Sequence, residues 1–499
     1  MTAKKRISFR LPPADHTSAV HHEAAADQNT IAVGKAIRAV SRALDGANEH
    51  DKVLLRAAAG AGKSYALRRM VKDALDHPGC SRVAITAFAN KQVFLLAEAL
   101  GLELGRDKVC LFVSAARMAD VPISTVSAVM VETQGSALPV DAKVVLGTSH
   151  RLGAFGEYRR IVDHLGAASN GERPFDLLFV DEAWQLPLHR FTTVENLAPV
   201  AVGVGDVGQL PPIDPSQNPW RGDTGYNPYR AWPTQFEGHA STFAVDLPAV
   251  WRPNVAQLPL WRAFYDEWDP LYCVAAGGDR ALILPELSGA AADIWASVAT
   301  GVPTLVEVDG LEDPEAPDID APLLGVLEDM LDVLLTEGFE IRSRVYDDAG
   351  RPGAMKSVHS STPSGDPLIV VLATRNQAVD DAADMVERLV AKHGLADGVL
   401  VASTVDSWQG QTNAVTVALH PLSGASELDE FNSAFGRLAV TCTRATHGLL
   451  LLARSGLNEL LDTAPPRQGT PFGEPGTRAL PRQTHQRILR AFATGTLRR

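Results

Sequence analysis

A short loop with two glycines separates a run of apolar residues from a segment with helical periodicity. Residues 53–57 read VLLRA and residues 58–64 read AAGAGKS. Apolar residues then recur at helical spacing over 64–75. In a strand–loop–helix unit of this kind, backbone N–H groups at the start of the helix can point at a bound anion. The unit predicts layered α/β structure with parallel strands.

Other short apolar runs alternate with helical segments along most of the chain. Nearly continuous apolar runs suit parallel strands that are covered on both faces. We therefore predict an α/β fold with two parallel-sheet domains. The runs occupy residues 53–57, 83–87, 144–148, 176–180 and 201–205, and then 368–373, 399–403, 414–419 and 449–453.

The spacing of these runs also predicts the domain boundaries. The acidic stretch 307–320 is interpreted as a solvated loop, and a short helix is expected near 482–493. The tail could contact nucleic acid or be merely solvated. The predicted parts are a flexible N-terminus at 1–25, a first domain at 26–253 with a small insertion near 101–143, a connecting segment at 254–366, a second domain at 367–460 and an arginine-rich tail at 461–499.

Composition limits the classes of function. The formal charge of the 499 residues is −13, which argues against an overall basic coat for nucleic acid but does not exclude a local basic groove. The four scattered cysteines contain no CxxC pair, so we expect buried thiols in a reducing compartment. No apolar run approaches the ~18 residues that span a bilayer, and no signal peptide is evident. The expected location is the cytoplasm, without membrane association.

The residues of the glycine-bearing loop suit a phosphate chain. Gly60 and Gly62 permit a tight turn, Lys63 supplies positive charge to the β- and γ-phosphates, and Ser64 offers a hydroxyl to Mg²⁺. The alternative is a chance glycine-rich turn. The predicted nucleotide-binding segment is Ala59, Gly60, Ala61, Gly62, Lys63, Ser64 and Tyr65.

Two carboxylates follow the apolar run 176–180. Ligands gather at the carboxyl ends of parallel strands, so Asp181 is predicted to hold Mg²⁺ and Glu182 to accept a proton from an attacking water. The alternative is a pair of surface acids at a strand end. Together with the glycine-bearing loop, the pair predicts hydrolysis of a nucleoside triphosphate.

A series of further motifs resembles superfamily-1 helicases, within them the branch of the nonsense-mediated decay helicase and related DNA helicases. The resemblance implies two RecA-like domains with a nucleotide cleft between them, ATP and Mg²⁺ as cofactors, and a single-stranded nucleic acid as partner. The motifs occur in the family's order at 57–64 (AAAGAGKS), 86–92, 147–151, 181–185 (DEAWQ), 205–212 (GDVGQLPP), 250–254 (VWRPN), 374–377, 404–412 (TVDSWQGQT) and 439–449 (AVTCTRATHGL).

The resemblance also implies roles for residues in these motifs. Arg252 and Arg444 would place positive charge on the γ-phosphate, because a planar guanidinium suits the charge that phosphoryl transfer spreads over its oxygens. Gln209 would sense that phosphate or position water, unless it is only a turn residue. Trp251 would stack on the base, with core packing as the alternative. Gln28 would read adenine, with an exposed polar residue as the alternative. Gly410 completes the predicted nucleotide-binding set.

A single strand is held by stacking on aromatic rings and by contacts to its backbone. Phe88 lies where related helicases place a base-stacking aromatic residue, although a core phenylalanine is the alternative. Five further residues at or near predicted strand ends could contact phosphates or sugars. They are Thr86, Asn90, Thr148, Thr404 and Trp408.

The sequence departs from the family pattern at three positions, one of which is Cys442, before the arginine of the last motif. Ala57 replaces the usual first glycine, and Thr412 stands where a glutamate near the ribose is common, so ribose discrimination is open. The favoured function is an ATP-driven helicase or translocase on single-stranded DNA or RNA, with DNA the favoured partner, and the resemblance implies 5′→3′ movement. The alternative is an ATP-dependent switch that regulates a partner such as a nuclease without unwinding. A small-molecule kinase would leave the later motifs unexplained.

Overall fold

The computed structural model describes residues 6–13, 20–47, 49–169, 171–208, 212, 226–265, 268, 270–316, 319–374, 376–428, 435–465 and 481–499. These residues form two compact units. We call Gln28–Leu247 the N-terminal unit, and the described residues before Gln28 and after Leu247 the C-terminal unit. Helix α1 (His22–Leu44) crosses the boundary between them along the chain.

A single eight-stranded parallel sheet forms the centre of the N-terminal unit. Its strand order is β4-β3-β5-β2-β6-β7-β1-β8. Every residue of β2, β6 and β7 is buried, as expected for strands covered on both faces. The strands are β1 (Lys52–Ala57), β2 (Val83–Ala87), β3 (Val109–Phe112), β4 (Met130–Glu132), β5 (Val144–Thr148), β6 (Leu177–Asp181), β7 (Val200–Asp206) and β8 (Thr242–Leu247).

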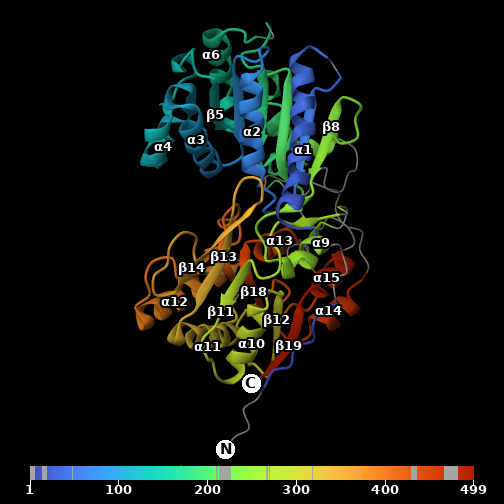
Figure 1. The fold of residues 1–499 in the computed structure, drawn as a ribbon, viewed down its shortest axis with the longest axis vertical. Helices are drawn as coiled ribbons and strands as arrows, with labels where there is room; N and C mark the ends of the chain where they lie inside the picture. The colour runs from blue at the N-terminus through green and yellow to red at the C-terminus, as the bar shows by residue number, and fades with distance from the viewer. Residues whose placement is uncertain are drawn as a thin grey trace, which may run out of the picture. The chain divides into compact units, whose positions relative to one another are not determined.

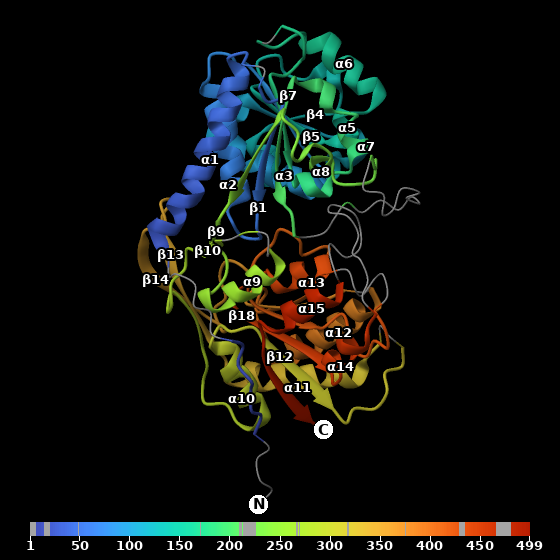
Figure 2. The ribbon, with the colours of Figure 1, turned by 90° about the vertical axis from the view of Figure 1, so that its right-hand side faces the viewer.

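Helices cover both faces of this sheet. Figure 2 shows α1 and α2 (Lys63–Asp76) on one side and α6 (Phe155–Leu165) and α7 (Leu188–Phe191) on the other. The predicted periodicity of 64–75 is confirmed, because Leu67, Met70 and Val71 of α2 are buried. On the strand side, Gly203 of β7 lets Trp232 pack closely, since a Cβ there would lie 2.7 Å from the indole ring. The remaining helices are α3 (Asn90–Leu104), α4 (Ile123–Ala128), α5 (Ser149–Leu152) and α8 (Trp232–Phe236).

The C-terminal unit contains a second parallel sheet of six strands. Its order is β16-β15-β17-β18-β12-β19. The predicted α/β class with two RecA-like parallel sheets is therefore confirmed. The strands are β12 (Thr304–Asp309), β15 (Ile369–Ala373), β16 (Leu400–Thr404), β17 (Asn413–Leu419), β18 (Ala445–Arg454) and β19 (Ala493–Arg498), and the helices are α12 (Asn376–His393), α13 (Phe435–Cys442), α14 (Leu457–Thr463) and α15 (Pro481–Leu489).

The second sheet extends beyond the predicted limits of 367–460. Strand β12 comes from the segment predicted to be a connection, and β19 comes from the segment predicted to be a tail. The two strands pair in parallel with each other, and β12 also pairs with β18. Both predictions were wrong at these strands. Each strand has only six residues, and β19, at the edge of the sheet, has few apolar residues and gives a weak periodic signal.

The chain also orders residues before α1. Arg10 forms an antiparallel bridge with Thr494 of β19, and a Cβ at Gly495 would lie 2.7 Å from the ring of Phe9. The prediction of a flexible segment over 1–25 is therefore wrong for residues 6–13, and also for His22–Ala25, which belong to α1. Figure 1 shows this N-terminal segment running along the C-terminal unit.

The segment 254–366 forms helices and a small antiparallel sheet. Strand order β11-β13-β14 joins β11 (Arg280–Ile283) to the hairpin of β13 (Glu340–Tyr346) and β14 (Pro352–His359), seen in Figure 1. The interpretation of 307–320 as a solvated loop needs correction, because Asp320 pairs with Arg454 at 2.7 Å and accepts the Leu323 N–H at the start of α11. The helices are α9 (Leu258–Phe264), α10 (Gly289–Ala299) and α11 (Ala321–Glu337).

The predicted insertion near 101–143 is instead part of the first sheet. Its strands β3 and β4 form one edge of that sheet, and all four residues of β3 are buried. The prediction of buried thiols is confirmed, since the four cysteines are free and buried. Burial raises the pKa of the Cys80 and Cys110 thiols to about 12. In the described part of the chain, no helix is long and apolar enough to cross a bilayer.

A buried histidine after β17 gives a testable dependence of stability on pH. His420 is 2% exposed, and burial together with the nearby His485 lowers its pKa to about 3. The unfolded state binds a proton near pH 6.5 whereas the folded state does not, so stability falls as the pH drops below 6.5. At pH 5 this one group costs about 2 kcal/mol of unfolding free energy.

His420→Asn keeps an acceptor for the Leu422 N–H, which donates to the imidazole Nδ1 over 3.1 Å. Between pH 7 and pH 5, urea unfolding of the variant should lose about 2 kcal/mol less than the wild type. His359→Asn, at an exposed histidine of β14, is the control and should keep the wild-type difference. An unchanged pH dependence in His420→Asn would show that this imidazole is not buried in its neutral form.

Candidate nucleoside triphosphate site

The loop between β1 and α2 has the conformation of an anion-binding turn. Gly60 and Gly62 have φ angles of 72° and 90°, which lie in the left-handed region that favours glycine. Ala58, Ala59 and Ala61 are buried, so the small side chains of the loop are covered by the surrounding unit. Helix α2 begins at Lys63, and its first N–H groups are available to an anion.

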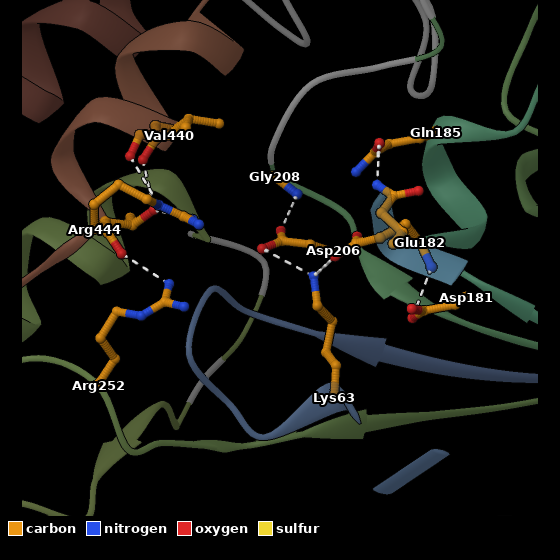
Figure 3. A network of polar contacts seen from close by, with 12 residues as sticks. Lys63, Asp181, Glu182, Gln185, Asp206, Gly208, Arg252, Val440 and Arg444 are labelled. Carbon is orange, nitrogen blue, oxygen red and sulfur yellow. Dashed lines mark hydrogen bonds and ion pairs between the residues drawn. The ribbon is translucent and has the colours of Figure 1, made fainter. Parts of the chain in front are cut away.

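Acidic side chains from two neighbouring strands meet Lys63. Its Nζ lies 2.9 Å from Glu182 Oε1, at the end of β6, and 3.9 Å from Asp206 Oδ2, at the end of β7. Figure 3 shows the ammonium group between these two carboxylates. The structure thus brings Lys63 and Glu182 together, and it adds Asp206, which the sequence analysis did not single out.

Asp206 is fixed by its position and by the backbone. It is 3% exposed, it lies opposite Ala57 in the register of β7 with β1, and its Oδ1 accepts the Gly208 N–H over 2.9 Å. The signal in the sequence was its place after the apolar run 201–205. Because parallel strands end at the same edge of a sheet, a carboxylate there lies beside the glycine-bearing loop.

Asp181 is more deeply buried than its neighbour Glu182. Its side chain is buried, and burial raises its pKa, with a further increase from the negative charge of Glu182. Lys63 opposes this increase, and the Glu182 N–H donates to Asp181 Oδ1 over 3.0 Å. A buried carboxylate of this kind gains from an additional cation.

Glu182 has a conformation that is rare for a residue with a side chain. Its φ is 48° and its ψ is 47°, in the left-handed region. Such a conformation costs on the order of 1 kcal/mol or more and persists where the surroundings require it. Here it ends β6 and turns the chain into the one-turn helix 183–185, while the carboxylate stays on Lys63.

The residues present suit a magnesium ion held together with a nucleotide. Asp181 and Ser64 offer the hard oxygen donors that Mg²⁺ prefers, and Ser64 is exposed in the first turn of α2. Among the described residues, no group of three or more His, Cys, Asp and Glu side chains could hold a metal ion by itself. Phosphate oxygens would therefore be needed to complete such a site.

The polar residue of α1 that contacts the loop is Asn29. Its Nδ2 donates to the Ala61 carbonyl over 2.9 Å, and the side chain is 7% exposed. The neighbouring Gln28, which the resemblance implies for adenine, is exposed. Asn29 was missed because a lone asparagine in a helix carries no motif.

Asn29→Ala is expected to weaken ATP binding. The change removes a buried donor and leaves the Ala61 carbonyl without it, so the loop is held less firmly. We expect the KM for ATP to rise by about five- to ten-fold, since ~1 kcal/mol is at stake. The measurement is steady-state ATPase kinetics, with Thr30→Ala, an exposed neighbour on α1, as the control. A KM equal to that of the wild type would contradict this role.

Two arginines of the C-terminal unit meet at one residue. Arg252 Nη1 donates to the Thr443 carbonyl over 3.0 Å, and Arg444 Nη2 donates to the Thr443 hydroxyl over 3.0 Å. Arg444 is 1% exposed, and its Nε donates to the Val440 carbonyl over 3.1 Å. Figure 3 shows Arg252, Arg444 and Val440 in this cluster.

The departure at position 412 has a local explanation in this cluster. Arg252 Nε donates to the Thr412 hydroxyl over 3.1 Å. The Thr412 hydroxyl therefore contacts an arginine that the resemblance implies for the γ-phosphate. Gly410, two residues earlier, has a φ of 82°, which explains the glycine at this turn.

Trp251 lies in a small cluster of the C-terminal unit. It is partly buried against Ala25, Ala26, Ala249 and Val274, and its ring meets Tyr346 edge to face, with 6.4 Å between the ring centroids. This packing is the alternative that the sequence left open for Trp251, whose side chain is partly exposed.

The predicted nucleic-acid residues of the N-terminal unit differ in exposure. Phe88 and Asn90 are partly buried after β2, and the Phe88 ring lies 6.1 Å from that of His150, which follows β5. Thr148 is used as a helix cap, since its hydroxyl accepts the Arg151 N–H. Thr86 is fully buried and its hydroxyl has no partner among the described residues, so it offers no surface to a strand.

In the C-terminal unit, Thr404 and Trp408 have local partners. The Thr404 hydroxyl accepts the Ser407 N–H over 2.9 Å. Trp408 is 7% exposed and its Nε1 donates to Asn413 Oδ1 over 3.0 Å, which is the arrangement of a core residue. Gln209 lies outside the described residues.

A comparison with protein families matches the part of the chain that contains the candidate nucleotide site. Residues 40–215 match the family model of an AAA domain. This span contains the loop after β1 and the acidic ends of β6 and β7. No curated protein matches the chain.

Several solved structures are similar to the chain at low identity. They include the PRRSV helicase (14% identity, TM-score 0.36, 86% of this chain and 58% of that chain). A complex of arterivirus nonstructural protein 10 (helicase) with DNA matches at 13% identity and a TM-score of 0.36, over 86% of this chain and 65% of that chain. The Hef helicase domain of Pyrococcus furiosus matches at 11% identity and a TM-score of 0.33, over 83% of this chain and 95% of that chain. The chain thus spans less than two thirds of these two viral helicases.

Proposed function

We propose that this protein hydrolyses ATP in response to single-stranded nucleic acid, as a superfamily-1 helicase or translocase. The observation that carries the proposal is the meeting of Lys63, Glu182 and Asp206 at the ends of neighbouring parallel strands, beside a loop with two left-handed glycines. This is the chemistry that holds a triphosphate and activates water against its last phosphate.

The residues around the loop have different roles in ATP binding and hydrolysis. Lys63 moves from Glu182 to the β- and γ-phosphates when ATP binds, which frees the Glu182 carboxylate to accept a proton from the attacking water. Asp181 and Ser64 would hold Mg²⁺, which would supply positive charge to the phosphate oxygens. Ala59, Ala61 and Tyr65 complete the loop around the nucleotide, and Gln209 positions the water.

Arg252 and Arg444 supply further positive charge in the ATP-bound state. Both contact Thr443, which lies between α13 and β18, so a shift of this residue would act on both guanidinium groups. If both guanidinium groups reach the γ-phosphate, hydrolysis removes the anion that attracts them. The protein then binds the single-stranded nucleic acid less tightly. Gln28 and Trp251 would read the base in this state.

The nucleic acid would lie across Phe88, Asn90 and Thr148 of the N-terminal unit, with Thr404 in the other unit. Phe88 stacks on a base, a contact that tolerates any sequence. We propose movement from 5′ to 3′, from the resemblance of the motif series, and single-stranded DNA as the favoured partner over RNA. A partner protein such as a nuclease, and a cytoplasmic location, are parts of the same proposal.

The decisive experiment measures the ATPase rate with single- and double-stranded DNA and RNA at two salt concentrations. We expect single strands to stimulate hydrolysis, and their apparent affinity to fall at higher salt because phosphate contacts release counterions. No stimulation by any oligonucleotide would overturn the proposal. Stimulation without strand displacement would favour a translocase or a switch over a helicase.

A further inference from the structure

A glutamine at the start of α3 joins two parts of the N-terminal unit that the proposed function keeps separate. Gln92 Oε1 accepts the Ala89 N–H over 3.1 Å, and Gln92 Nε2 donates to Gln185 Oε1 over 3.2 Å. Ala89 lies between Phe88 and Asn90. One partly buried side chain therefore contacts both the segment proposed to bind nucleic acid and the segment that follows Glu182.

Gln185 is in turn connected to the proposed catalytic base. Its N–H donates to the Glu182 carbonyl over 2.8 Å, across the one-turn helix 183–185. Glu182 has left-handed backbone angles, so a small displacement of this turn changes where its carboxylate points. The hydrogen bonds form a continuous path from Ala89 to Glu182 through two glutamine side chains.

Within the described residues, the Gln185 side-chain amide forms a hydrogen bond through its oxygen but not through its nitrogen. Its Nε2 is buried and has no hydrogen-bond partner among the described residues. A buried donor without a partner is destabilising, and native proteins have few of them. The unpaired Nε2 is consistent with a second conformation of the Gln185 side chain, in which the Gln92 and Gln185 amides form a different hydrogen bond.

We propose that Gln92 is a positioning residue that couples nucleic-acid binding to hydrolysis. A strand phosphate or base bound at 88–90 competes for the Ala89 N–H or shifts it, and Gln92 passes this change to Gln185 and hence to the turn that carries Glu182. The inference rests on the proposed function, and it names the side chains that transmit the stimulation. A purely structural role, as a cap of α3, would affect folding but not the degree of stimulation.

The test compares the stimulation ratio, which is the ATPase rate at saturating single-stranded DNA divided by the rate without DNA. Gln92→Met removes both hydrogen bonds at similar size and should lower the ratio about five-fold or more. The DNA concentration for half-maximal stimulation should change less than two-fold. Gln92→Glu should keep most of the ratio, because its carboxylate accepts from Ala89 and from the unused Gln185 Nε2.

Gln134→Met, the same substitution at an exposed position of this unit, is the matched control. Gln185→Met should resemble Gln92→Met, and the double variant should lose no more than either single variant, because both changes break one path. Ratios that fall independently and multiply would overturn the inference, as would a wild-type ratio in Gln92→Met. Gln185→Met tests the path even if Gln92→Met does not fold.

These outcomes separate the two proposals. If the wild-type protein shows no stimulation by single strands, the proposed function fails. If the wild type is stimulated and the glutamine variants keep its ratio, only the coupling role of Gln92 fails.

Discussion

Lys63→Ala is expected to lower the rate of ATP hydrolysis by about 10²- to 10³-fold, as for the loss of one preorganised charge at a transition state. Lys63 lies at the start of α2 and is the cation between Glu182 and Asp206. In the variant, no lysine charge would offset these two carboxylates, and they would therefore repel the triphosphate. The pKa of Asp181, which Lys63 now lowers, would rise further and weaken the grip on Mg²⁺.

The measurement is the ATPase rate at saturating single-stranded DNA, together with the equilibrium affinity for ATP. We expect both to fall, because Lys63 contributes to ground-state binding and to the transition state. Lys72→Ala removes an exposed lysine from the same helix and should leave both unchanged. Full activity in Lys63→Ala would show that the loop after β1 does not hold the triphosphate.

The features that the sequence predicted correctly are those with strong local signals. Strands β2 and β5 begin and end where their apolar runs do, because buried parallel strands need continuous apolar residues. Lys63 and Glu182 lie beside each other because each follows such a strand, and strands of one parallel sheet end at one edge. Here the chemistry of neighbouring residues and the topology agree.

The features that the sequence missed depend on pairing between distant segments. Strand β19 is recognisable only once β12 lies beside it, since TLVEVD and ATGTLR each have a weak pattern alone. Asn29 contacts Ala61 across 32 positions, and nothing in DQNT distinguishes it from Gln28. Trp408 matched a motif, yet its hydrogen bond to Asn413 and its burial give it the place of a core residue.

Glu182→Gln is expected to separate ATP binding from hydrolysis. The glutamine has the same size, and its Oε1 can still accept a hydrogen bond from Lys63, so the loop and its lysine keep their arrangement. Removing the negative charge also lowers the pKa of Asp181, which Glu182 now raises, so Asp181 stays ionised for Mg²⁺. An amide cannot accept the proton of the attacking water, so we expect hydrolysis to fall by about 10²- to 10⁴-fold.

Single-turnover hydrolysis and the Kd for ATP, measured on the same preparation, check this expectation. The rate should fall while the Kd stays within a few fold of the wild type, and the variant with ATP should hold single-stranded DNA longer, because release waits for hydrolysis. Glu103→Gln is the control. Glu103 lies on α3 and forms an ion pair with Arg68 of α2 at the surface, and such pairs contribute little to stability. Normal turnover in Glu182→Gln would remove Glu182 as the base and leave Asp206, the other acid beside Lys63, as the next residue to test.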